Sequence, residues 1–207
     1  MEVTKLSNVD ILKDILRPNL SLVICGTSVG KCSAEVGSYY AGASNLFWKI
    51  LRETKLTKDE NPIASDNCED LLSYGIGLTD IAKKVSGVDA GISEKDYDIE
   101  DFISKMNLFK PKIVCFNGKR AAAIFLSWKL NRKVKTSDFD YGPYQIKDCK
   151  FRIFIAPSTS GSAKRYWEPA YWHELAELIV PSNTLLLKWK NCISIIIKIK
   201  LATSVFT

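Results

Sequence analysis

The sequence lacks residues that several common kinds of active site require. It contains one histidine, His173, among 207 residues, and no G-x-S-x-G motif. A Ser–His–Asp hydrolase would therefore depend on a single imidazole, without the sharp turn that exposes a nucleophilic serine. We set this class aside. We expect His173 to be packed or solvated, because it lies in a predicted helix between Trp172 and Glu174.

Paired cysteines are also missing. None of the six cysteines forms a C-x-x-C pair, and their spacing does not match a set of metal ligands. Cys25 and Cys115 lie within apolar runs, where a free thiol behaves as a small hydrophobic group. We therefore expect neither zinc nor an iron–sulfur cluster. The N-terminus does not resemble a signal peptide, so we expect reduced thiols in an intracellular protein.

Long uncharged apolar runs are absent as well. The segment 185–207 is rich in isoleucine, but Lys188, Lys190, Lys198 and Lys200 interrupt it. Its uncharged stretches are shorter than the roughly 20 apolar residues that span a bilayer, so we expect no membrane partner. The remaining length suits one well-buried domain. We assign residues 1–180 to that domain and 181–207 to an atypical C-terminal tail without an assigned role.

Basic residues outnumber acidic ones, 29 to 23, which gives a formal net charge of +6. This excess favours a polyanionic partner without establishing one. Basic residues gather at 119–120, 129–135 and 164–165, and acidic residues gather at 59–70 and 94–101. The distribution indicates a polarised surface, and an ordinary solvated surface explains it equally well.

Strand-like apolar runs alternate with helical patterns along the chain. The predicted strands are 20–25, 113–116 and the pair 144–146 and 151–155. The predicted helices are 45–55, 93–105 with Ser93 as N-cap, 120–130, and one that ends at 179, with a helical turn at 69–74 and a loop at 74–79. The alternation predicts an α/β fold with a parallel sheet covered on both faces.

Three predicted loops carry glycine, serine and asparagine where ligands bind such sheets, at the carboxyl ends of strands. In Gly26–Gly30 the glycines let backbone amides approach a ligand closely. It is not a phosphate-binding G-x-x-x-x-G-K-[ST] loop, because it is one residue short and Cys32 replaces the hydroxyl. The loop 156–161 offers hydroxyl and amide donors to phosphate, although such turns often serve only as caps.

Taken in order, these loops resemble the motifs of the mismatch-specific uracil/thymine DNA glycosylase family. Gly26–Gly30 (GTSVG) looks like the family's G-I-N-P-G, and Tyr40–Lys49 is similar to its Y/F-x-x-x-x-N-x-F-W-K. The segments 74–79, 116–119 and 156–160 resemble the thymine DNA glycosylase branch. The likeness spans about residues 10–180. It implies a three-layer α/β/α sandwich with a short central parallel sheet.

The resemblance also implies a function and a set of site residues. Such an enzyme flips a base out of duplex DNA and hydrolyses its N-glycosidic bond without metal or cofactor. Ser28 would occupy the catalytic position, and the base pocket would comprise Thr27, Ser33, Tyr40 and Asn45, with the base stacked on Tyr40. The expected DNA contacts are Asn117, Lys119, Ser158, Thr159, Ser160, Gly161, Ser162, Lys164 and Arg165.

Ser28 departs from the family pattern, which has an asparagine that orients the attacking water at this position. Loss of one well-placed polar group lowers a rate by ~10²–10³-fold. One interpretation is a weak monofunctional glycosylase that prefers uracil over thymine opposite guanine. A second is a catalytically impaired protein that binds mismatches or abasic sites. A third is a Rossmann-like enzyme of free nucleosides or nucleotides, which predicts little affinity for DNA and no salt-dependent binding.

The glycosylase interpretation carries three further expectations. The partner is double-stranded DNA that holds a mismatched or damaged base. The protein is a monomer. Its location is the nucleus if the organism is a eukaryote, and the cytoplasm otherwise.

Overall fold

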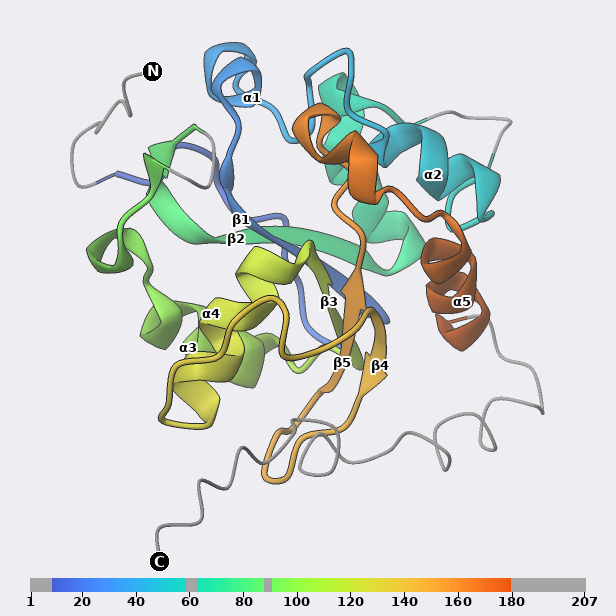
Figure 1. Cartoon of the computed structure of the whole chain (residues 1–207). Helices are drawn as coiled ribbons and strands as arrows, with labels where there is room; N and C mark the ends of the chain where they lie inside the picture. The colour runs from blue at the N-terminus through green and yellow to red at the C-terminus, as the bar shows by residue number, and fades with distance from the viewer. Residues whose placement is uncertain (1–8, 59–62, 88–90, 180–207) are drawn as a thin grey trace, which may run out of the picture.

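A five-stranded sheet forms the centre of the computed structural model, which describes residues 9–58, 63–87 and 91–179 (Figure 1). The strand order is β2-β1-β3-β5-β4. The strands are β1 (Leu22–Val29), β2 (Ile76–Ser86), β3 (Ile113–Asn117), β4 (Gly142–Tyr144) and β5 (Arg152–Ala156). β2, β1, β3 and β5 are parallel, and the edge strand β4 is antiparallel to β5.

Helices cover both faces of the sheet. They are α1 (Lys31–Val36), α2 (Phe47–Glu53), α3 (Ile99–Phe109), α4 (Lys119–Lys129) and α5 (Ala170–Ile179), with 3₁₀ segments η1 (Ser65–Tyr74), η3 (Glu94–Asp96) and η4 (Gly161–Tyr166). α2 and α5 lie on one side and α3 and α4 on the other (Figure 1). The α/β class and the helix-covered sheet predicted from the sequence are confirmed.

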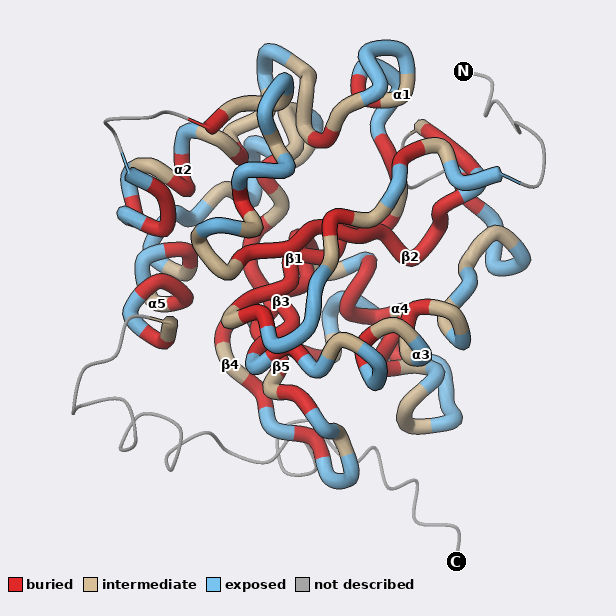
Figure 2. Tube along the Cα trace, turned by 180° about the vertical axis from the view of Figure 1, so that it is seen from behind, coloured by how far each residue is buried: buried red, intermediate tan, exposed pale blue. Residues whose placement is uncertain are grey.

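The two hydrophobic clusters show how alternate residues of β1 divide between the layers. Leu22 and Ile24 pack with Phe47 of α2 and Trp172 of α5. Val23 and Cys25 pack on the other side, in the cluster that holds Phe102, Met106 and Phe125 of α3 and α4. Successive side chains of a strand point to opposite faces. The buried strands consequently form the centre of the molecule in Figure 2, with exposed segments around them.

Two predicted loops turn out to be strand. β1 continues to Val29, so most of the predicted loop 26–30 extends the sheet. The predicted loop 74–79 contains only a turn at Gly75, with φ of 73°, and β2 begins at Ile76. Gly77 lies within this strand. A side chain is excluded at this position because a Cβ would come within 2.6 Å of the Ile15 carbonyl oxygen. The glycine lets the preceding segment cross β2.

Other differences concern boundaries. The helix predicted over 93–105 divides into η3, which Ser93 precedes, and α3, whose N-cap is Asp98. The strand predicted at 144–146 is β4 at 142–144. The predicted tail 181–207 lies outside the described residues. Among the helices that the structure describes, none has the length and apolar character needed to cross a membrane.

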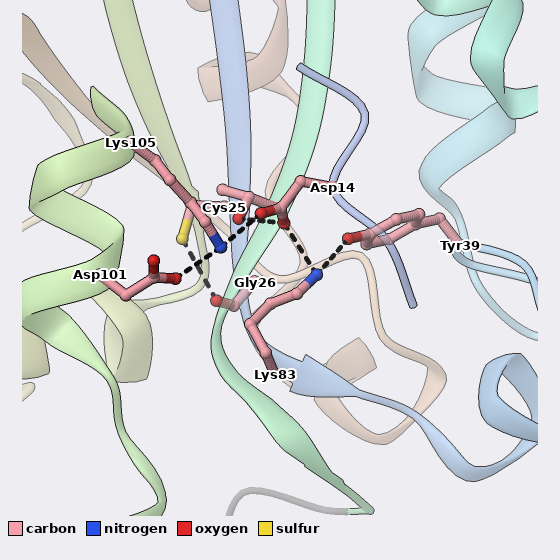
Figure 3. Close-up of polar contacts among 8 residues, drawn as sticks. Asp14, Cys25, Gly26, Tyr39, Lys83, Asp101 and Lys105 are labelled. Atoms are coloured by element: carbon pink, nitrogen blue, oxygen red, sulfur yellow. Dashed lines mark hydrogen bonds and ion pairs between the residues drawn. The ribbon is translucent and has the colours of Figure 1, made fainter. Parts of the chain in front are cut away.

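A buried network of charges joins four segments at the edge of the sheet (Figure 3). The Asp14 carboxylate accepts hydrogen bonds from Lys83 Nζ at 2.8 Å, Lys105 Nζ at 2.6 Å and Thr79 Oγ1 at 2.7 Å. The Lys83 side chain is only 3% exposed, and it also donates to Tyr39 Oη at 2.9 Å. The network therefore ties the segment before β1, strand β2, helix α3 and the segment that holds Tyr39.

Asp14 should contribute stability that depends on pH. Burial raises the pKa of its carboxyl, but the Lys83 charge and hydrogen bonds from Lys105, Lys83 and Thr79 outweigh burial and hold it below its usual value. A lowered carboxyl pKa contributes stability that is present above the ordinary pKa and lost as the pH falls through the folded-state pKa. We expect Asp14→Asn to lower the free energy of unfolding by about 3 kcal/mol at neutral pH, because Lys83 loses its carboxylate.

Urea unfolding at neutral and acidic pH measures both effects. The difference between wild type and Asp14→Asn should shrink as the pH falls below the usual range of a carboxyl pKa. Asp10→Asn, an exposed acid on the same segment, is the control and should change stability by less than about 0.5 kcal/mol. An equal difference at both pH values would contradict the assigned role of Asp14.

Candidate active site and DNA-contact surface

The polar strand ends meet at one cavity of about 870 Å³. The carboxyl half of β1 forms part of its wall, together with the segments after β3 and β5 and the segment between α1 and α2. The loops that the sequence singled out at 26–30, 117–119 and 156–161 therefore lie together. This arrangement follows from the parallel order of β1, β3 and β5, which places their carboxyl ends at the same edge.

Ser28 and the four residues of the predicted base pocket all line this cavity. Thr27 and Ser33 are buried, and Tyr40 and Asn45 are partly buried. Ser33 Oγ accepts a hydrogen bond from the Ala41 amide at 3.1 Å, and Asn45 Oδ1 accepts one from the Phe47 amide at 3.0 Å. Both side chains thus hold the segment that carries Tyr40. Their contact with a base stays a prediction.

Aromatic neighbours fix the Tyr40 ring. It stacks on Phe47 with ring centroids 3.7 Å apart and an interplanar angle of 20°. Trp48 meets the ring edge-on at 6.4 Å, and its Nε1 donates to the Tyr40 carbonyl at 3.2 Å. The Tyr40 backbone has a φ of 53°, which is rare for a bulky residue and persists only where the surroundings impose it. The Phe-Trp pair of the motif therefore supports Tyr40.

The floor of the cavity is polar and shielded from water. Ser28 Oγ and Tyr40 Oη are buried and have no hydrogen-bond partner within the part of the chain that the structure describes. Asp80 on β2 lines the same cavity and is 5% exposed. Burial raises the pKa of the Tyr40 phenol well above its usual value, and the Asp80 charge raises it further. Two hydroxyls and a carboxylate therefore belong to residues that line this cavity.

The second and third loops are joined through a buried pair of side chains. Asn117 Nδ2 donates to Thr159 Oγ1, and the Thr159 amide donates to Asn117 Oδ1, each at 3.0 Å. Thr159 is fully buried, and its carbonyl accepts from the Leu46 amide at 2.9 Å. Both residues therefore use their polar groups to connect the loops. Their predicted contact with DNA remains untested.

The other predicted DNA contacts fall into an exposed group and a half-buried group. Ser162, Lys164 and Arg165 are exposed on η4, while Ser158, Ser160 and Gly161 are half-buried at the rim. Lys119 is also half-buried: its Nζ donates to the Phe139 carbonyl and lies 4.8 Å from the centre of the Tyr141 ring. The exposed group is open to solvent, whereas Lys119 is held at the cavity wall, and contact of either with DNA stays a prediction.

Asp80 and Tyr166 are among the cavity-lining residues that the sequence motifs did not indicate. Asp80 directly follows the motif 74–79, but that segment was predicted as a loop and an isolated acid forms no pattern. Tyr166 is 55% exposed at the rim, with the Arg165 guanidinium 4.6 Å from its ring centre. No cluster of potential metal ligands occurs among the described residues.

Comparisons with known proteins agree with the geometry. The family model described as "Uracil DNA glycosylase superfamily" matches residues 14–177. A G/U mismatch-specific uracil DNA glycosylase of Schizosaccharomyces pombe (strain 972 / ATCC 24843) is 27% identical over 157 residues, which cover 74% of this chain and 48% of the relative. The chain thus spans about half the length of this curated relative.

A solved structure shares the fold. It is the solution NMR structure of a Methanosarcina acetivorans protein proposed to be a uracil DNA glycosylase, with a TM-score of 0.57 and 20% sequence identity. The match covers 81% of this chain and 96% of that one. Since the family model matches most of the sequence, and the motifs predicted to form a site meet at one cavity, this chain belongs to the uracil DNA glycosylase superfamily.

Proposed function

We propose that this protein is a monofunctional DNA N-glycosylase that removes uracil mispaired with guanine from duplex DNA. The observation that carries the proposal is that the motif residues Ser28, Tyr40 and Asn45 line the same cavity. Its volume of about 870 Å³ lies within the range of small-ligand sites. The curated relative from S. pombe is named for the same G/U specificity.

The reaction requires the uracil nucleotide to leave the helix and enter the cavity. There the base stacks against Tyr40, whose other neighbours already hold its ring in place. Water attacks C1′ of the deoxyribose while the bond between C1′ and N1 breaks, and its electron pair passes to the base. Fixed dipoles at the cavity wall stabilise the negative charge that develops on uracil. One proton from the water finally neutralises the base, and an abasic site remains.

Ser33 supports the preference for uracil over thymine. Its side chain faces the cavity, and its hydrogen bond with the Ala41 amide holds it against the Tyr40 segment. A hydroxyl fixed at this wall narrows the space for a 5-methyl group. The departing thymine is also the poorer leaving group. Both effects favour uracil. As a repair enzyme, the protein would act in the nucleus of a eukaryote.

The catalytically impaired binder remains the second candidate, because Ser28 replaces the water-orienting asparagine. Such a protein would use the same cavity to hold an extruded base or an abasic site. Its affinity for mismatched DNA would equal that of an active glycosylase. Only a measurement of bond cleavage separates the two.

Single-turnover excision from labelled duplexes with one G·U or one G·T pair, followed by alkali cleavage, separates them. We expect cleavage at G·U and at least about tenfold slower cleavage at G·T, since a small steric difference changes a rate by this order. Faster thymine release would contradict the preference. Excision by Ser28→Asn without excision by wild type would identify the impaired binder. No excision by either protein would refute the glycosylase proposal.

Binding to DNA should depend steeply on salt, because neutralised phosphates release counterions. We expect Lys164→Gln to lower the slope of log affinity against log salt by about 1, as for loss of one phosphate contact. Lys164 is exposed beside the rim of the cavity. Fluorescence anisotropy with a G·U duplex at several salt concentrations measures the slope.

Lys110→Gln is the matched control for this measurement. Lys110 is exposed after α3, shortly before β3 begins, and so lies at the amino end of that strand, away from the cavity. Its variant should keep the wild-type slope. Binding that does not respond to salt in any of the three proteins would instead favour an enzyme of free nucleosides.

A further inference from the structure

The proposed hydrolysis needs an acceptor for a proton of the attacking water, and Ser28 is a weak one. A neutral hydroxyl can orient water but does not take up its proton at neutral pH, whereas a carboxylate does. Among the described residues that line the cavity, the only carboxylate is that of Asp80, and histidine is absent from them. Asp80, on strand β2, is therefore the candidate proton acceptor among these residues.

We propose that Asp80 is the general base of this site, and that it holds the attacking water together with Ser28. This assignment rests on the proposed glycosylase function. It adds a catalytic residue on a strand that the sequence motifs did not identify, and it gives Ser28 the role of a second ligand to the water.

The pairing of β1 and β2 places Asp80 beside the strand that carries Ser28. Gly26 and Asp80 are register partners, and Ser28 pairs with Ala82. Leu22 and Ile24 of β1 pack in the same cluster as Ile76 and Leu78 of β2. Because side chains alternate between faces, Gly26, Ser28 and Asp80 follow on that same face.

Gly26 leaves the space that the Asp80 carboxylate occupies. A Cβ at Gly26 would come within 2.3 Å of Asp80 Oδ1 and 3.8 Å of Tyr40 Oη. Ser28 lies roughly 7 Å further along β1, since two residues of a strand span this length. A water molecule with hydrogen bonds of about 2.8 Å to each side bridges oxygens about 5–6 Å apart. Both residues line the same cavity, where a water that enters with the substrate can contact the Asp80 carboxylate and the Ser28 hydroxyl.

Burial makes Asp80 effective toward a developing cation. Its residue is 5% exposed, so little solvent screens its charge. The pKa of Tyr39 and of Tyr40 is raised first by burial and then by the Asp80 charge. When the C1′–N1 bond breaks, positive charge develops on the sugar, and a fixed carboxylate nearby stabilises it.

Hydrolysis of the C1′–N1 bond consumes one water molecule and regenerates the Asp80 carboxylate. The water oxygen forms a bond to C1′, the pair from the C1′–N1 bond remains on uracil, and one water proton passes to Asp80. That proton then leaves to the uracil anion or to solvent, which restores the carboxylate. Other titratable groups that interact electrostatically with Asp80 are Tyr39, Tyr40 and Cys25, and the charges of Asp14 and Lys83 act on Cys25 as well.

The test compares single-turnover excision from a G·U duplex across pH for wild type and Asp80→Asn, which preserves the size of the side chain. We expect the variant rate to fall by about 10²–10⁴-fold and to lose the acid limb of the wild-type profile. Affinity for the duplex should change less than about threefold, because the variant keeps the contacts that bind substrate and transition state equally. Glu35→Gln, an exposed acid on α1 outside the cavity lining, should match wild type.

A second pair of variants distinguishes loss of the catalytic carboxylate from loss of folding. Gly26→Ala should lower the rate by displacing the carboxylate, and formate should partly restore the rate of Asp80→Ala by supplying a carboxylate in the vacated space. A structural role alone would not give formate rescue. Circular dichroism and thermal unfolding show whether each variant is folded.

Three outcomes separate this proposal from the function on which it rests. Wild-type activity together with an unchanged rate and pH profile in Asp80→Asn would overturn the role of Asp80 alone. A slower variant that keeps the acid limb and now releases cytosine would assign Asp80 to the base edge, and so overturn its role toward water. Absence of excision by wild type and Ser28→Asn would refute the glycosylase function itself.

Discussion

The parallel pairing of β1 with both β2 and β3 is the constraint on which the site depends. β1 is hydrogen-bonded on each side, so its register fixes two neighbours at once. Through β2 it brings Asp80 opposite Gly26, and through β3 and β5 it aligns the strand ends that carry Asn117 and Ser158. A slip of one residue would turn the whole polar set to the opposite face of the sheet. The core and the cavity are thus determined by the same register.

Side-chain hydrogen bonds and rings then connect the loops above this sheet. The Asn117–Thr159 pair joins two of them, and the Thr159 carbonyl holds the start of α2 through the Leu46 amide. Phe47, the first residue of α2, supports the Tyr40 ring. A continuous set of contacts therefore runs from the end of β3 to the aromatic residue that borders the cavity.

Local sequence patterns predicted many of the helices and strands of this fold. They could not predict which distant segments pair with one another. The spacing of Leu46, Ile50 and Leu51 indicated α2 because an amphipathic helix repeats locally. β2 was missed because glycines ordinarily mark a turn, whereas Gly77 serves the crossing of the segment that contains Ile15. The place of Asp80 beside Gly26 depends on strand register, for which one sequence offers no signal. Resemblance identified the motif residues, but not the carboxylate among them.

Tyr39 and Tyr40 are adjacent in sequence but serve different parts of the molecule. Tyr39 accepts a hydrogen bond from Lys83 in the charge network, and Tyr40 borders the cavity. The position of one ring is therefore mechanically linked to that of the other. A natural variant at Asp14 or Lys83, neither of which belongs to a motif, would therefore alter the geometry of the cavity. In a genetic screen it would be classed with the active-site defects, although its immediate effect is on an ion pair at the sheet edge.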